Sequence, residues 1–184
     1  GSLDEAAFYH TVLSAEEIAE SIKPKEDNIK PNSELISHYS FNESNNIGKD
    51  NCNNYNMVSA AENSLVDGVV GNAVNIEVNG FDLPLYNASD AIDGESDFTV
   101  LAFVKLNDIS QTGKRVIFSN GGFGKKGISF GFEGEDDFFV STDNTVQSFS
   151  ISEKISSFDI ENWHNYAVSV SDRRNLTVYK KKKK

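Results

Sequence analysis

Residues 97–105 read Asp-Phe-Thr-Val-Leu-Ala-Phe-Val-Lys, and they decide the fold class of this chain. In an extended chain, Phe98, Val100 and Val104 share one face, and the residues between them point to the other. Such a period of two, built from aromatic and β-branched residues, is typical of a β-strand with a buried face. The stretch therefore predicts a long strand in the core of a β domain.

Four further stretches repeat this alternation of apolar and polar side chains. Segments rich in Asn, Gly, Asp and Ser separate them, and the chain has 13 Phe and 20 Asn but only 3 Pro. Strands that recur every 8–12 residues or so, with turn residues between them, are typical of an antiparallel sandwich. The pattern predicts an all-β fold, an antiparallel two-sheet jelly-roll sandwich. The four stretches are residues 73–78, 128–132, 164–170 and 176–178.

One stretch has a helical pattern. Ser14 and Glu17 have the spacing of a capping box, and an apolar stripe that ends at Ile22 follows them. Residues 23–33 are polar, contain two prolines and show no periodicity, so we expect a linker there. The sequence therefore predicts a short N-terminal piece with one helix at 3–22, then a linker, then the β domain.

Charge and composition exclude several classes of protein. Lys plus Arg is 17 and Asp plus Glu is 28, which gives a net charge of −11, or −16 without the lysines at 180–184. A body this acidic repels phosphate backbones, so we expect no nucleic-acid partner. No apolar run approaches the ~18 residues of a membrane span, so we expect no membrane insertion. Cys52 is the single cysteine, which excludes an intrachain disulfide and a multi-cysteine metal site.

Five segments carry a family resemblance together. They are Glu34–Phe41, the Gly-rich turn and strand Val66–Val74, Asp97–Lys105, the Trp-His strand Trp163–Val170, and Leu176–Tyr179. In this order they resemble the laminin-G-like jelly rolls of the concanavalin A-like lectin/glucanase superfamily. The resemblance covers residues 34–179 and implies a jelly-roll sandwich over that range.

The N-terminal piece resembles the end of such a domain although it comes first. Residues 3–18 are similar to the family's last strand and terminal helix. Either they are the tail of a preceding repeat, or their strand fills a place in the sheet of its own chain or, by strand exchange, of a neighbour. A linker of about 11 residues can span roughly 35 Å, so we favour closure within the chain. The lysines at 180–184 have no counterpart in the family, and we expect them to form a solvated tail.

The sequence offers no convincing catalytic group. Glycoside hydrolysis needs two carboxyl groups on either side of the scissile bond. The local candidate is Glu133-Gly-Glu-Asp-Asp137, which we interpret instead as a solvated acidic hairpin. None of His10, His38 and His164 lies beside a nucleophile motif. We predict that this domain is not an enzyme, although another domain of the same protein could be one.

The resemblance implies a non-catalytic module that binds a carbohydrate or another ligand. We expect it to belong to a secreted or cell-surface protein, with a glycan or a surface protein as its partner. The alternative is a structural or adhesive spacer repeat without a small ligand, or a protein–protein interaction domain. Sugar sites combine an aromatic platform with amide and carboxylate groups on loops. The candidates of this kind are Tyr55, Phe81, Tyr86, Asn87, Asp90 and Phe123.

The resemblance also implies one structural calcium ion, held where the first and last strands meet. Hard cations take carboxylate, amide and carbonyl oxygens. The matching positions are Asp4 and Asn42, with Asp50 as a weaker third. If Asp4 is a ligand, the ion would clamp the N-terminal strand onto the domain. The alternative is that these residues are ordinary surface acids and amides.

Overall fold

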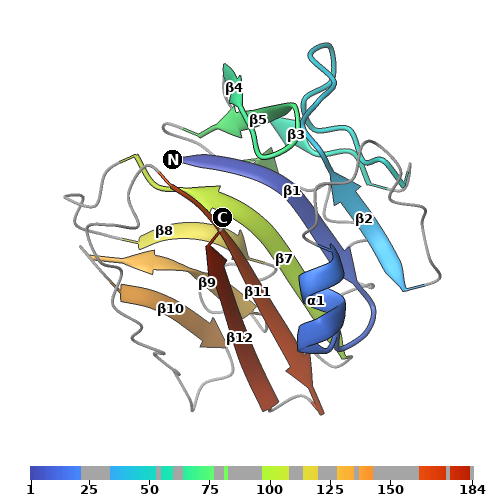
Figure 1. Ribbon diagram of the computed structural model, residues 1–184, viewed down its shortest axis with the longest axis vertical. Coiled ribbons are helices and arrows are strands. Elements are labelled where there is room, and N and C mark those ends of the chain that lie inside the picture. Colours follow the sequence, from blue (N-terminus) through green and yellow to red (C-terminus); the bar gives the residue numbers. More distant parts are fainter. Residues whose placement is uncertain are drawn as a thin grey trace. The chain divides into compact units, whose positions relative to one another are not determined.

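The chain divides into two compact units, Gly1–Lys105 with Trp163–Lys184, and Leu106–Asn162. Both consist of antiparallel strands, and the first unit also contains a short helix (Figure 1). The architecture is mostly β and is consistent with a jelly-roll sandwich. The computed structural model describes residues 1–21, 34–52, 55–59, 64–76, 81–82, 97–107, 114–119, 128–134, 137–142, 162–172 and 175–182.

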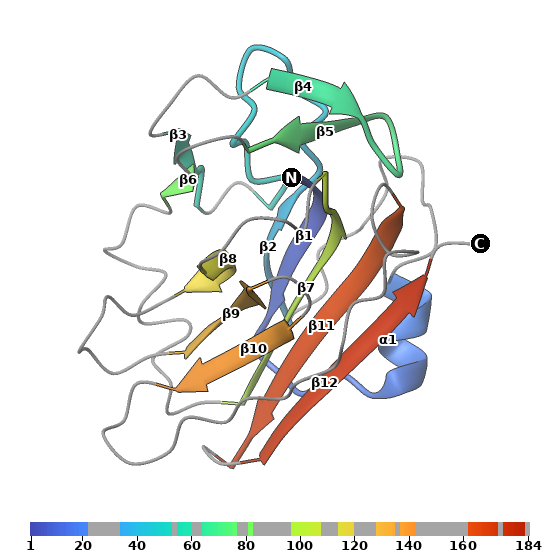
Figure 2. The same ribbon diagram turned by 90° about the vertical axis from the view of Figure 1, so that its left-hand side faces the viewer.

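The first unit contains a seven-stranded antiparallel sheet. Its order is β12-β11-β7-β1-β5-β4, and β2 also pairs with β1 (Figure 2). A short separate pair is formed by β3 (Val58–Ser59) and β6 (Phe81–Asp82). The strands of the large sheet are β1 (Ser2–Tyr9), β2 (Leu35–Tyr39), β4 (Ser64–Asp67), β5 (Asn72–Asn75), β7 (Phe98–Lys105), β11 (Trp163–Ser171) and β12 (Asn175–Lys182).

Strand β7 is the predicted core strand. Every residue from Phe98 to Val104 is buried, so both faces of the strand are shielded from water. Its neighbour β11 is buried on both faces from His164 to Val170. Near-continuous apolar runs fit such positions, because neither face of the strand contacts solvent.

Strand β1 lies inside the sheet of its own chain. Along one edge it pairs with β7, from Ser2 opposite Lys105 to Tyr9 opposite Thr99. Along the other edge it pairs with β2 and, at its start, with β5. The N-terminal segment therefore completes the sheet intramolecularly in this structure.

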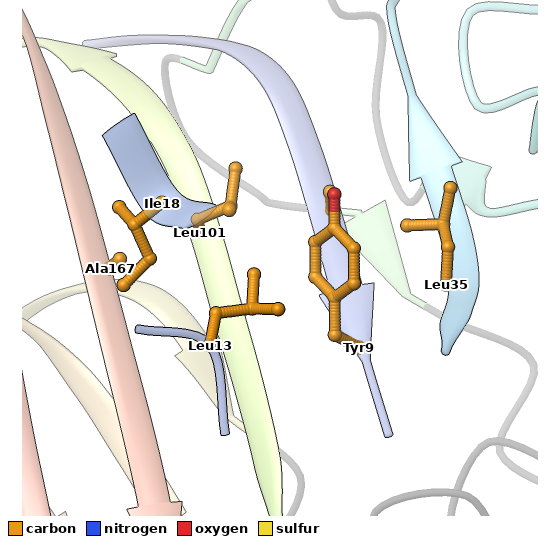
Figure 3. Close-up of a cluster of buried hydrophobic side chains, with 7 residues drawn as sticks. Tyr9, Leu13, Ile18, Leu35, Leu101 and Ala167 are labelled. Atoms are coloured by element: carbon orange, nitrogen blue, oxygen red, sulfur yellow. The ribbon is translucent and has the colours of Figure 1, made fainter. Parts of the chain in front are cut away.

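Helix α1 (Ala15–Ser21) begins at the predicted capping box. The backbone N–H of Ser14 donates to Glu17 Oε2 at 2.8 Å, and that of Glu17 donates to Ser14 Oγ at 3.2 Å. The helix buries Ile18 against apolar side chains of the sheet (Figure 3). The cluster consists of Ala7, Tyr9, Leu13, Ile18, Leu35, Leu101 and Ala167.

The second unit is a three-stranded sheet in the order β10-β9-β8. It consists of β8 (Lys114–Ser119), β9 (Ile128–Glu133) and β10 (Asp137–Thr142). Asp137 lies opposite Glu133 in the antiparallel pairing of β9 and β10, which fits the predicted hairpin. Buried Phe rings pack against one another in tilted pairs within this unit, the centroid of Phe130 lying 5.6 Å from that of Phe118 and 6.2 Å from that of Phe138.

The lysine run at 180–184 is not wholly a solvated tail. Strand β12 continues to Lys182, so that Lys180 lies opposite Tyr166 and Lys182 opposite His164. Strand β12 continues this far because β11 begins at Trp163 and supplies backbone hydrogen-bond partners along its length. In the part of the chain that the structure describes, no helix is long and apolar enough to cross a membrane.

Candidate functional site

Five polar side chains form a network around the start of β1. We call this set the polar network. Strand β1 supplies two of them, β2 supplies one, and the segment that follows β2 supplies the other two. Its members are Asp4, Glu5, His38, Asn42 and Asp50.

Asp4 is fully buried and binds main-chain amides. Its Oδ2 accepts hydrogen bonds from Val69 N at 2.6 Å and Val70 N at 3.2 Å, and its Oδ1 accepts one from Glu5 N at 2.9 Å. Burial raises the pKa of the Asp4 carboxyl to about 7, and the negative charge of Glu5 adds to this, whereas the three amides oppose it. A Cβ at Gly68 would lie 2.6 Å from Oδ2, so glycine permits the close approach.

Asn42 holds the same turn between β4 and β5. Its Oδ1 accepts a hydrogen bond from Asn72 N at 2.6 Å. Gly71, directly before Asn72, has φ +67°, and a Cβ there would overlap the Asn42 side-chain oxygen. The Gly-rich turn thus needs glycine for two reasons, its left-handed backbone and the close approach of Asn42.

Asp50 organises the loop after β2. Its Oδ1 accepts hydrogen bonds from His38 N and Cys52 N, and its Oδ2 accepts one from Tyr55 N, all at 2.9 Å. Asp50 is fully buried. Burial, with the Asp50 charge adding to it, raises the pKa of the Cys52 thiol to about 11. A thiol of that pKa forms little thiolate near neutral pH, which argues against a nucleophilic role for Cys52.

Glu5 and His38 form a short side-chain hydrogen bond across β1 and β2. Glu5 Oε2 lies 2.6 Å from His38 Nε2, and the two side chains are 15% and 5% exposed. The pairing of β1 with β7 shifts by one residue between Asp4 and Ala7, which is a β-bulge. Glu5 sits in this bulge with φ +48°. The bulge brings the Glu5 carboxylate to the His38 ring.

The carboxylates of the network therefore bind groups of the protein itself. Those of Asp4 and Asp50 accept backbone N–H groups, and that of Glu5 contacts a histidine. Within the described ranges, no group of three or more His, Cys, Asp or Glu side chains is placed to hold a metal ion. Of the predicted calcium ligands, Asp4 and Asn42 meet at one turn, whereas Asp50 binds a different loop.

The predicted sugar-binding residues fall mostly outside the described part of the chain. Tyr55 is half-buried, and its carbonyl accepts a hydrogen bond from the Tyr39 hydroxyl at 2.6 Å. Phe81 is in β6, where its backbone pairs with Ser59. Four of the predicted residues lie outside the described ranges: Tyr86, Asn87, Asp90 and Phe123.

Two features of this unit could not be found by reading residues locally. The Glu5–His38 contact joins residues 33 positions apart and depends on the bulge. Lys105 Nζ lies 5.4 Å from the centre of the Trp163 ring, because the two residues are directly opposed in the pairing of β7 and β11. Only the strand register, which is non-local, could reveal either of them.

Of three comparisons with known proteins, one found a match. A family model described as the concanavalin A-like lectin/glucanases superfamily matches residues 83–180. The match spans 98 of the 184 residues and includes β7 and β11. Searches of the curated proteins and of the solved structures found no match.

A pair of glycine substitutions tests the contact between Asn42 and the turn. Gly71 and Gly134 have nearly equal φ, +67° and +64°, but a Cβ at Gly134 meets nothing within 4 Å. Gly71→Ala should therefore lower the free energy of unfolding by about 1–3 kcal/mol more than Gly134→Ala, because it adds overpacking to the same strain. Urea titration measures both values. In an Asn42→Ala background the excess should vanish, and an excess that persists there would contradict the contact.

The raised pKa of Asp4 predicts an unusual dependence of stability on pH. A carboxyl with a folded-state pKa near 7 and an ordinary value of 3.8 stabilises the fold fully below pH 3.8. This contribution is lost as pH rises from about 4 to 7 and amounts to about 4 kcal/mol. Asp4→Asn cannot ionise, so its free energy of unfolding should rise relative to wild type over that range. Parallel pH profiles of the two proteins in urea titrations would show that Asp4 does not titrate this way.

Proposed function

Because the chain belongs to the concanavalin A-like lectin/glucanase superfamily, we propose that it is a non-catalytic module that binds a glycan, within a secreted or cell-surface multidomain protein. Membership supports a carbohydrate- or protein-binding module in general terms. Laminin-G-like domains are generally non-catalytic, although some members of the superfamily are glycosidases. The glycan, the secretion and the absence of catalysis are our inferences beyond that membership.

The way the polar network positions Tyr55 carries the glycan proposal. The Tyr55 amide donates to Asp50, and its carbonyl accepts from the buried Tyr39, so hydrogen bonds hold its backbone on both sides. The residue is half-buried rather than enclosed. An aromatic residue with a fixed backbone and partial exposure, on an Asn-rich loop, can offer a sugar the flat apolar surface that stacking requires.

The bonding of the acidic side chains supports a non-catalytic role. General acid–base chemistry on a glycosidic bond needs two carboxyl groups that reach the substrate. In the polar network, the carboxylate oxygens of both aspartates accept hydrogen bonds from backbone amides, and both residues are fully buried. Glu133 is exposed on a hairpin and lies 4.0 Å from Lys114 Nζ. A spacer or a protein-binding repeat is the other function that suits such a domain.

Calcium remains our proposed structural ion. What supports it is that Asp4 and Asn42 reach the same turn, where main-chain carbonyls are further oxygen donors. Such an ion would be bound by a mixture of carboxylate, amide and carbonyl oxygens. It would add to the attachment of β1 that the amide bonds of Asp4 already provide.

A glycan array with the full chain tests the proposed ligand class. We expect at least one group of glycans to be retained. Tyr55→Ala should weaken its binding by about tenfold or more, equivalent to about 1.4 kcal/mol. Tyr55→Phe keeps the ring and should bind as wild type does, so it is the matched control. Titration calorimetry with the retained glycan measures the difference. An array on which nothing is retained would favour the spacer or protein-binding function.

Thermal unfolding in calcium and in EDTA tests the proposed ion. An ion that binds only the folded state adds about 2.7 kcal/mol at 100 times its Kd. The wild-type Tm should therefore rise in calcium and fall in EDTA. Asn42→Ala should abolish the difference between the two conditions, whatever its own Tm. Equal Tm values for the wild type in calcium and EDTA would contradict the proposal that the domain binds a structural calcium ion.

A further inference from the structure

Three asparagines of this chain stand in the triplet Asn-x-Ser or Asn-x-Thr, the acceptor signature for N-linked glycosylation of secreted proteins. The triplets are Asn42-Glu-Ser44, Asn87-Ala-Ser89 and Asn175-Leu-Thr177. In a chain with 20 Asn such a short triplet also arises by chance, so the surroundings of each amide decide whether it can carry a sugar. Asn87 lies outside the described residues, which leaves Asn42 and Asn175 to compare.

The amide of Asn42 is part of the fold. Asn42 is half-buried, and its Oδ1 accepts a hydrogen bond from Asn72 N at 2.6 Å. A Cβ at Gly71 would come within 3.3 Å of Asn42 Nδ2, so the backbone of the turn lies close to the nitrogen that a sugar would occupy. A glycan on this nitrogen would compete with the contact that holds the turn between β4 and β5. The surroundings of Asn42 therefore oppose a glycan.

The amide of Asn175 has no such role in the fold. Asn175 is the first residue of β12 and is exposed. Its Nδ2 donates to Asp172 Oδ2 at 3.5 Å, a contact between two exposed side chains. This distance is longer than the usual N–H···O range of about 2.7–3.2 Å, so the contact holds the amide weakly. A sugar on Nδ2 would displace little that stabilises the protein.

The hydroxyl of the same triplet is accessible from the same side. Successive side chains of a strand alternate between its two faces, so Asn175 and Thr177 point one way and Leu176 the other. The antiparallel pairing of β12 with β11 is regular over these residues. Thr177 is exposed, whereas Leu176 is half-buried. The amide and the hydroxyl that define the triplet therefore both face solvent.

The position of Asn175 in the sheet leaves space for a bulky group. Strand β12 ends the strand order and pairs with β11 alone among the described strands. In Figures 1 and 2 the end of β11 and the start of β12 lie together at one end of the large sheet. A glycan at this hairpin would extend away from the sheet without separating any pair of strands.

We propose that Asn175 is an N-glycosylation site and that Asn42 is not. The donor is an oligosaccharide linked to a lipid through pyrophosphate. Asn175 Nδ2 forms a bond to the anomeric C1 of its first sugar, the bond from C1 to the pyrophosphate oxygen breaks, and the lipid pyrophosphate leaves with the electron pair while the amide loses one proton. This inference rests on the proposed secretion, because N-linked glycans are added to exported chains. It does not depend on which glycan the domain itself binds.

Secretory expression of the full chain in mammalian cells tests the site. The chain follows a cleavable signal peptide and carries Ser89→Ala, which removes the third triplet without changing Asn87. Peptide N-glycosidase F releases N-linked glycans and converts each carrier asparagine to aspartate, which peptide mass spectrometry locates. We expect this conversion at Asn175 in most molecules, whether they are taken from the cells or from the medium. In the protein exported to the medium we expect Asn42 to stay unconverted.

Matched variants separate the two triplets. Thr177→Ala should abolish the conversion at Asn175, and Thr177→Ser, which keeps the hydroxyl, should restore it. Ser44→Ala removes the triplet at Asn42 but leaves the Asn42 amide bonded to the turn, so it should not change the glycan-dependent shift on a gel. Ser44 and Thr177 are both exposed, so we expect all three variants to fold as the parent does.

An unmodified Asn175, in cells that glycosylate a co-expressed reference glycoprotein, would overturn the proposal. So would a glycan on Asn42 in the exported protein. The glycan array uses chain made in bacteria that lack the transferase, so the two tests are independent. An unmodified Asn175 with glycans retained on the array contradicts this inference alone, and a modified Asn175 with nothing retained contradicts the proposed glycan binding alone.

Discussion

Strand β1 exchanges main-chain hydrogen bonds with β7 along one edge and with β2 and β5 along the other, so it connects two parts of the large sheet. The rest of the first unit depends on this position. Helix α1 follows β1 and packs on Leu101 and Ala167, and Asp4 anchors the turn between β4 and β5. A segment at the start of the chain thus completes a sheet whose other strands come much later in the sequence.

The polar network makes that position specific. Hydrophobic burial alone would tolerate a slip of two residues along the neighbouring strands, because such a slip leaves the same set of β1 side chains on the buried face. Asp4, with its amide partners at Val69 and Val70, and Glu5, with its contact to His38, accept only one register. The same network reaches Tyr55 through Asp50, so the attachment of β1 and the loop proposed to bind sugar are parts of one hydrogen-bonded system.

Local pattern predicted the elements whose side chains are governed by burial. The alternation at 97–105 and 164–170 corresponds to β7 and β11, both buried on two faces, and the capping box at Ser14 begins α1 as expected. Strand β8 was not predicted, because Phe118 is its single buried residue and the pattern is correspondingly weak.

The sequence could not reveal what depends on non-local contacts. Asp4, Asn42 and Asp50 were singled out as oxygen donors, but the sequence could not show that they accept hydrogen bonds from the amides of Val69, Asn72 and His38, which lie 12 or more positions away along the chain. Glu5 has φ +48° without being Gly or Asn, so no turn signal marks the bulge. The strand extension through Lys182 likewise depends on the length of β11 rather than on the lysines.

Amide hydrogen exchange of the full chain tests most directly whether β1 occupies the middle of the sheet. Amides of a central strand exchange only when the sheet opens, whereas those of a loosely bound terminal segment exchange at low free energy. The arrangement predicts that the hydrogen-bonded amides of residues 3–9 are protected to the same degree as those of β7. Rapid exchange across residues 3–9, while β7 and β11 remain protected, would contradict it.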